Sequence, residues 1–242
     1  MPDAIHFRIL GYMTTIVLHV ANAVIMMSSF RDDDIKEVEI RHYQKMQPFF
    51  FTCWTFFFQV VFSGLSLYCD VQIMRNTKNK AYRLPEILEK ARVELFNTIV
   101  WPASTLVFTM FWLFYAVDRD LIYPTAIDKA ISPTSNHIMH TYIFPFVLWE
   151  MMFYYRERPA NVFWRAAAVI SLEVIYFLTL IFVKMYFGVW IYPFFGKINE
   201  LLIIPGSFTI IALFLYGTQK LQWILYSMLW EGRRKPIVLK IN

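Results

Sequence analysis

The sequence predicts an all-α fold, a polytopic membrane bundle of about six transmembrane helices that forms a single domain over residues 1–242. Hydrophobic residues make up 58% of the 242 residues and charged residues only 17%, whereas soluble domains carry about 25% charged residues. Apolar stretches recur along the chain, and each approaches the roughly 20 residues that a helix needs to cross a bilayer. Polar connections separate them, so we expect spans at about 9–29, 49–69, 95–117, 137–155, 166–187 and 201–230.

Basic residues outnumber acidic ones by 23 to 18, but they are spread over the connections and form no dense patch. The sequence therefore predicts a membrane protein without a nucleic-acid partner. The side of the bundle that holds both termini carries more Lys and Arg, and the positive-inside rule then predicts cytosolic termini. The expected location is the endoplasmic reticulum or the plasma membrane.

The first span, about 9–29, is long enough to be a retained helix and not a cleaved signal peptide. His19 lies within it, and we expect this lone histidine to be hydrogen-bonded inside the bundle. The connection over 31–47 carries both signs of charge, including three consecutive aspartates from Asp32. It lacks the alternating ligands and the turn glycine of an EF-hand, so the sequence predicts a solvated surface loop and no metal site.

The second span, about 49–69, carries one polar stripe. At about 100° per residue its six members fall within an arc of about 80°: Thr52, Thr55, Gln59, Ser63, Ser66 and Asp70. Because lipid cannot satisfy hydroxyl and amide groups, the stripe must face other helices or a wet cavity. Helix-to-helix contact is the simpler explanation, whereas the bulkier Gln59 and Asp70 favour a functional site.

A basic connection over about 72–94 follows, and Pro85 is placed to start a short surface helix within it. The third span, about 95–117, has Pro102 near its start. The fourth, about 137–155, contains Pro145, which has no backbone N–H and is expected to kink the helix.

The fifth span, about 166–187, contains Glu173 and Lys184. A charge inside a bilayer costs on the order of 3 kcal/mol or more, so each should find a partner or reach the interface. The segment over 188–196 is too short to span, and its Trp190 and Tyr192 suit the aromatic belt at a membrane surface. The sixth span, about 201–230, ends in a basic flank that begins at Arg233.

Two histidines, His137 and His140, open the fourth span, and a helix places them at neighbouring positions of one face. Histidine is the side chain best able to exchange a proton near neutral pH. If six helices alternate in direction, the second and fourth spans enter the bilayer from the same side. Thr52 and His140 are each the fourth residue of a span, so they should lie at similar depth. The aromatic segment over 190–195 lies on that side and is placed to cap the space between them.

A hydroxyl, an imidazole and an aromatic lid together indicate an acyl-transfer site. An imidazole that takes the proton of an alcohol makes attack on an ester carbonyl feasible. The same imidazole can then protonate the leaving alcohol, which is worth about 10² to 10⁴ in rate. Asn136, His137 and Asp128 are the candidates to orient His140. The absence of a Gly-x-Ser-x-Gly motif argues against an ordinary α/β-hydrolase.

These residues belong to a longer set of motifs: Tyr115-Ala116, Asp118-Arg119, Ile122-Tyr123-Pro124, Asp128, Asn136-His137, Met139-His140-Thr141, Pro145-Phe146, Glu150 and the segment over 188–194. In this set the chain resembles the androgen-induced gene family of multipass membrane proteins. The resemblance covers spans two to six. The acidic first connection and the turn over 133–135 depart from the family pattern.

The resemblance implies an atypical threonine hydrolase that cleaves fatty acid esters of hydroxy fatty acids. His140 corresponds to the family's histidine because it precedes Thr141, as in the family's Met-His-Thr. The threonine corresponds to Thr52, seven residues before Gln59. Thr55 lies one turn away, and the pattern alone does not choose between the two threonines. The expected substrate is a lipid ester, and no cofactor or metal is expected.

Two other classes compete with this prediction. In a non-catalytic scaffold or signalling regulator, the polar stripe would only pack helices. In a transporter or haem-bearing electron carrier, axial ligands would come from facing helices. The three histidines within the predicted spans lie at uneven depths, which fits a haem site poorly.

Overall fold

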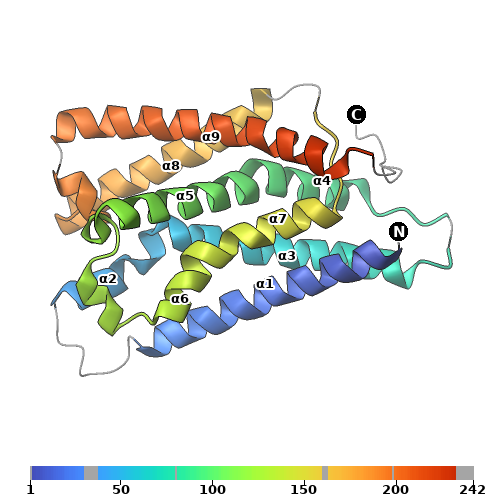
Figure 1. Ribbon diagram of the computed structural model, residues 1–242, viewed down its shortest axis with the longest axis horizontal. Coiled ribbons are helices and arrows are strands. Elements are labelled where there is room, and N and C mark those ends of the chain that lie inside the picture. The colour runs from blue at the N-terminus through green and yellow to red at the C-terminus, as the bar shows by residue number, and fades with distance from the viewer. Residues whose placement is uncertain (1, 30–37, 80, 160–162, 198, 233–242) are drawn as a thin grey trace.

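The computed structural model describes residues 2–29, 38–79, 81–159, 163–197 and 199–232, and within these ranges it contains helices and no strand. Figure 1 shows long helices packed side by side along one direction. Among the described residues, four helices are long and apolar enough to cross a membrane: Ala4–Ser29, Phe51–Arg75, Glu86–Leu121 and Trp164–Phe187. The predicted all-α membrane bundle is confirmed.

Long helical segments occupy the six predicted spans. Four of them are single helices: α1 (Pro2–Ser29), α3 (Phe51–Arg75), α8 (Phe163–Phe187) and α9 (Glu200–Trp230). The third segment joins α4 (Glu86–Leu95), the π-helical turn η2 (Phe96–Val100) and α5 (Trp101–Asp118). The fourth joins α6 (Pro133–His137), the π-helical turn η5 (Ile138–Tyr142) and α7 (Ile143–Phe153). That this fourth segment and α9 also cross the membrane stays a prediction.

Shorter helices connect these segments: α2 (Val38–Met46), η1 (Gln47–Phe49), η3 (Arg119–Leu121), η4 (Thr125–Lys129) and η6 (Pro193–Lys197). Successive long segments run in alternate directions, so α1 begins and α9 ends at the same end of the bundle (Figure 1). The second and fourth segments consequently start at the same end, as the sequence predicts.

Two prolines lie within the first three residues after the π-helical turns. Pro102 is the second residue of α5, after η2, and Pro145 is the third residue of α7, after η5. Proline has no N–H to donate to the carbonyl four residues earlier, and those residues, Thr98 and Thr141, lie inside the two turns. Local π geometry is one way for a helix to absorb such a missing bond. The irregularity expected at Pro145 therefore takes the form of a wider turn just before it.

Two connections contain more helix than the sequence predicts. The prediction of a surface loop over 31–47 is wrong for residues 38–46, which form α2. This segment is helical because its apolar residues Ile40 and Met46 are buried against the bundle. The aspartates from Asp32 lie outside the described residues. The short helix expected near Pro85 begins at Glu86, but it continues through η2 into α5 and does not end at the surface.

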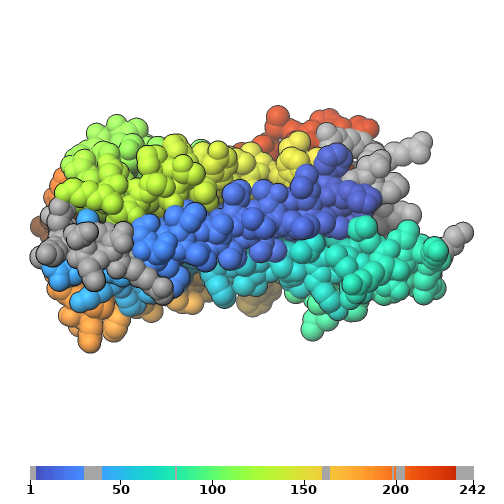
Figure 2. Space-filling model, turned by 90° about the horizontal axis from the view of Figure 1, so that it is seen from below, coloured from blue at the N-terminus to red at the C-terminus, as the bar shows by residue number. Residues whose placement is uncertain are grey.

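The polar stripe of α3 faces other helices over most of its length, since five members are at most 3% exposed: Thr55, Gln59, Ser63, Ser66 and Asp70. Figure 2 shows α1 crossing one face of the molecule between α7 and α3. His19 of α1 places Nε2 2.6 Å from Oε1 of Gln59, so its predicted hydrogen bond inside the bundle is present. The Gln59 amide also donates to Ser104 and to the Ile143 carbonyl at 2.8 Å, which ties four helical segments together.

A charged network closes the end of the bundle where α1 begins. Asp70 is fully buried and accepts hydrogen bonds from Arg8 at 2.8 Å and from Arg92 at 2.9 Å. A second buried pair joins Glu150 to Arg156 at 2.6 Å. Buried charges are tolerated when each is paired and hydrogen-bonded. Ion pairs through Asp70 therefore link the first, second and third segments at this end, whereas the Glu150–Arg156 pair lies at the end of the fourth segment.

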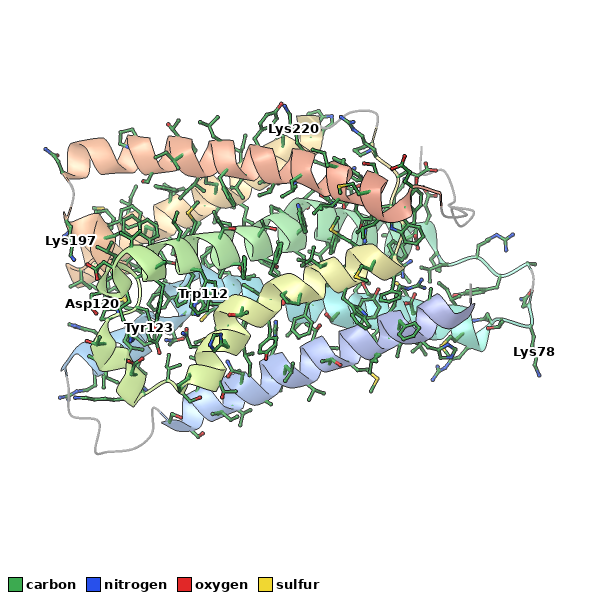
Figure 3. The ribbon with its side chains drawn as sticks, viewed as in Figure 1. Lys78, Trp112, Asp120, Tyr123, Lys197 and Lys220 are labelled. Carbon is green, nitrogen blue, oxygen red and sulfur yellow. The ribbon has the colours of Figure 1, made fainter. Side chains whose placement is uncertain are left out.

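The opposite end holds α2 and the connections η3, η4 and η6. Figure 3 labels Asp120, Tyr123 and Lys197 at this end and Lys78 at the other. Apolar clusters of the core also reach this end, with Phe111, Tyr123 and Ile127 packed in one of them. The candidate site lies toward this end.

Candidate active site

Thr52 lies at the beginning of α3. The backbone is extended at Phe50, after η1, and α3 starts at Phe51, so Thr52 is its second residue. The helix dipole makes the beginning of a helix positive, because its first N–H groups point outward along the axis. A hydroxyl at this position lies where negative charge on a reacting oxygen is stabilised.

His140 lies in the π-helical turn η5 and is 5% exposed. Its Nε2 is 3.4 Å from the Thr52 hydroxyl oxygen. This distance is long for a hydrogen bond, but catalytic hydrogen bonds are often long before substrate binds. Phe111 stacks on the imidazole with ring centroids 3.5 Å apart and planes within 4°, which fixes the ring orientation. The structure thus brings Thr52 and His140 together at matching depth.

Asn136 supplies the partner on the other side of the imidazole. Nδ1 of His140 lies 2.7 Å from Oδ1 of Asn136 and 3.1 Å from its carbonyl oxygen. Both oxygens only accept hydrogen bonds, so Nδ1 carries the proton in the neutral ring. Nε2 is then the unprotonated nitrogen and faces Thr52. Thr52, His140 and Asn136 thus supply a hydroxyl, a base and an amide that orients the base, which is the arrangement of groups in catalytic triads.

A cavity of about 410 Å³ opens in front of Thr52 and His140. Its walls come from α3, α5, α8 and α9 and are mainly apolar, including Leu106, Val107, Leu180, Ile211 and Leu215. The volume falls within the roughly 300–1,000 Å³ of small-molecule sites. Such a wall favours an acyl chain over a polar substrate.

The segment between α8 and α9 caps the cavity, as the sequence predicts. Tyr192, Phe194 and Phe195 line it from that segment. The Tyr192 hydroxyl lies 2.8 Å from the hydroxyl of Tyr176 on α8, and the backbone N–H of Phe51 donates to Tyr176 at 3.1 Å. The cap is therefore hydrogen-bonded to the residue that precedes Thr52.

Three polar groups of the cavity wall are buried and have no hydrogen-bond partner among the described residues. They are Nε2 of Gln47, the Tyr123 hydroxyl and both carboxyl oxygens of Glu173. Burial raises the pKa of Tyr123, so its hydroxyl stays protonated and can donate at neutral pH. The sequence predicts that Glu173 finds a partner or reaches the membrane interface. This prediction is wrong for the described part of the chain, because the Glu173 side chain is only 4% exposed and its carboxyl oxygens have no hydrogen-bond partner there.

The other candidates from the sequence lie elsewhere. His137 is exposed, stacks on Trp112, which Figure 3 labels, and bonds to Thr141 through Nδ1 at 3.0 Å. Asp128 is exposed and paired with Arg119 at 2.8 Å, so neither residue orients His140.

Thr55 is also separate from the reacting pair. It is fully buried, and its hydroxyl donates to the Phe51 carbonyl at 2.9 Å. Gln59 lies one turn further along α3. It is hydrogen-bonded to His19, Ser104 and the Ile143 carbonyl, and not to His140. Of the two threonines that the pattern leaves open, Thr52 is therefore the one that contacts the imidazole.

Sequence reasoning missed Phe111 and Tyr176. Aromatic residues make up 19% of the chain, so one more aromatic residue within an apolar span gives no signal. Among the described residues, no three His, Cys, Asp or Glu side chains gather as metal ligands.

Fold and site together define a helical membrane protein with a threonine, a histidine and an asparagine at one end of an apolar cavity. The chain matches the model of the FAR-17a/AIG1-like protein family over residues 11–227. It is 32% identical to the human androgen-dependent TFPI-regulating protein over 181 residues, which cover 74% of this chain and 75% of that protein. It is 31% identical to the human androgen-induced gene 1 protein, over 73% of this chain and 74% of that protein. The chain belongs to the FAR-17a/AIG1-like family, and no solved structure matches it.

Proposed function

We propose that this protein is an intramembrane ester hydrolase that cleaves fatty acid esters of hydroxy fatty acids, with Thr52 as nucleophile and His140 as general base. The contact that carries the proposal is the 3.4 Å approach of Nε2 of His140 to the Thr52 hydroxyl, at the end of an apolar cavity. Most of the α3 stripe is buried between helices, as a scaffold requires, but Thr52 is half-buried and lines the cavity.

In the first half of the reaction, Nε2 of His140 takes the Thr52 hydroxyl proton while the oxygen attacks the ester carbonyl carbon. The hydrogen bond from Nδ1 to Asn136 holds the imidazole and stabilises its charged form. The negative oxygen that develops lies near the positive end of α3. Among the described residues, the Tyr123 hydroxyl is a cavity group without a hydrogen-bond partner that can donate a further hydrogen bond to it.

When the tetrahedral intermediate collapses, the bond to the alcohol oxygen breaks, and the proton on Nε2 passes to that oxygen. The acyl group then remains on Thr52 as an ester. In the second half, His140 takes a proton from water, the hydroxide adds to the acyl carbon, and the acid leaves as Thr52 regains its proton. The net reaction consumes one water and yields a fatty acid and a hydroxy fatty acid.

The lipid substrate reaches the cavity from the bilayer, in the endoplasmic reticulum or the plasma membrane. With cytosolic termini, Thr52 and His140 lie toward the non-cytosolic face of the membrane.

A covalent serine- and threonine-hydrolase probe tests the proposal on purified protein in lipid nanodiscs. We expect labelling of the wild type and of Thr55→Ala, and no labelling of Thr52→Ala. Thr55 is the matched control because it is a threonine one turn away whose hydroxyl is engaged by the Phe51 carbonyl. A wild type that stays unlabelled at saturating probe would contradict the proposal and favour a non-catalytic scaffold.

A further inference from the structure

Among the described residues that line the cavity, Glu173 is the one that carries a carboxyl group. It lies on α8 beside the other cavity-lining residues of that helix: Val169, Leu172, Tyr176, Phe177 and Leu180. Tyr176 and Glu173 are three residues apart and share a helix face. The Tyr176 hydroxyl is already hydrogen-bonded to Tyr192, whereas Glu173 has no partner among the described residues.

Burial without a partner is costly for this side chain. Glu173 is 4% exposed, and neither of its carboxyl oxygens has a hydrogen-bond partner among the described residues. An isolated carboxylate in apolar surroundings costs much more than a neutral carboxyl group, and both need hydrogen bonds to offset their burial. The neutral group can donate one hydrogen bond and accept another.

The position of Glu173 separates it from the reacting pair. Tyr176 reaches the backbone beside Thr52, and Glu173 lies three residues before it on α8, toward the interior of the bundle. At 1.5 Å per residue this is about 4.5 Å further along the helix axis. A group bound by Glu173 therefore belongs to a part of the ligand other than the scissile ester.

We infer that Glu173 forms a polar subsite that hydrogen-bonds a hydroxyl or un-ionised carboxyl group carried by the lipid in this cavity. Either group can accept from and donate to a neutral carboxyl group, which completes both missing hydrogen bonds. This inference rests on the proposed function, since it concerns the lipid bound at the same site. It predicts selection for lipids with a second polar group over plain acyl esters.

Binding measurements test the subsite without requiring hydrolysis. The Thr52→Ala protein in nanodiscs is titrated with three probes of equal chain length: a hydroxy fatty acid methyl ester, an unsubstituted fatty acid and its methyl ester. Binding is followed by the ligand-dependent rise in Tm. The first probe carries only the hydroxyl group and the second only the carboxyl group, so their comparison identifies the group that Glu173 binds.

We expect at least one of the two polar probes to bind about tenfold more tightly than the plain methyl ester, the effect of one buried hydrogen bond. Adding Glu173→Gln, which keeps a donor and an acceptor, should preserve the preference, and adding Glu173→Leu should reduce it to less than about twofold. Equal binding of all three probes, or an unchanged preference with Glu173→Leu, would overturn the inference. If Glu173→Leu does not fold, Glu173→Met gives the same comparison. Because the Tm measurement detects binding and not hydrolysis, its result does not depend on whether the wild-type protein proves to be a hydrolase.

Discussion

Replacing Thr52 with alanine is expected to reduce hydrolysis of a fatty acid ester of a hydroxy fatty acid by at least about 10³-fold, because among the described residues it is the Thr52 hydroxyl that contacts Nε2 of His140. Thr52 is partly exposed to the cavity, and its hydroxyl contacts only a histidine that is held by other groups. Loss of one hydroxyl should therefore leave the fold intact. The measurement is kcat/KM in nanodiscs, with Tm recorded for the same samples.

His140→Ala should lower the rate by about 10² to 10⁴, the usual worth of a general acid and base. Thr55→Ala is the matched control and should retain activity close to that of the wild type. Turnover in the Thr52→Ala protein at more than a few per cent of the wild-type rate would reject Thr52 as nucleophile. A loss of activity in all three variants together with a lower Tm would point to folding and not to chemistry.

Asp70→Ala should give the largest loss of stability. Asp70 is fully buried between Arg8 and Arg92, and removing it leaves two guanidinium groups that face each other without their shared anion. Breaking a buried ion pair by deleting one partner costs about 3–5 kcal/mol. We expect a correspondingly large drop in Tm in detergent or nanodiscs, and low yields of the variant.

An exposed ion pair provides the control for that experiment. Glu86 and Lys90 lie 2.6 Å apart at the surface of α4, where solvent weakens the interaction. Glu86→Ala should change the free energy of unfolding by less than about 1 kcal/mol. Equal effects of Asp70→Ala and Glu86→Ala would show that the buried network does not hold this end of the bundle.

Much of the bundle can be predicted from the sequence because a lipid bilayer constrains the sequence in two ways. Spans must be apolar over about 20 residues, and polar groups within them must face protein. The polar stripe from Thr52 to Asp70 faces protein, as the second constraint requires. All of its members are buried except Thr52, which lines the cavity. The α2 helix could not be predicted from the sequence, because a short amphipathic segment at a bundle end forms a helix only if neighbouring residues cover its apolar face.

The approach of Thr52 to His140 could be predicted from alternating helix directions, because both residues lie equally far into their spans. Which neighbour orients His140 could not be predicted. Asn136 and His137 lie four and three residues before it, and the rotation of the π-helical turn decides which side chain reaches Nδ1. The sequence also could not predict that Glu173 lacks a hydrogen-bond partner among the described residues, since the partners of a buried side chain in a bundle come from helices that are far apart in the chain.

If Thr52 is the nucleophile, it carries the acyl group during turnover. The most direct measurement is mass spectrometry of the wild-type protein, quenched with acid while it hydrolyses a fatty acid ester, after digestion into peptides. We expect a peptide that contains Thr52 and is heavier by one acyl group, with the fragment ions placing the added mass on Thr52 itself. An acyl group on another residue such as Thr55, or steady turnover with no acylated peptide, would contradict it.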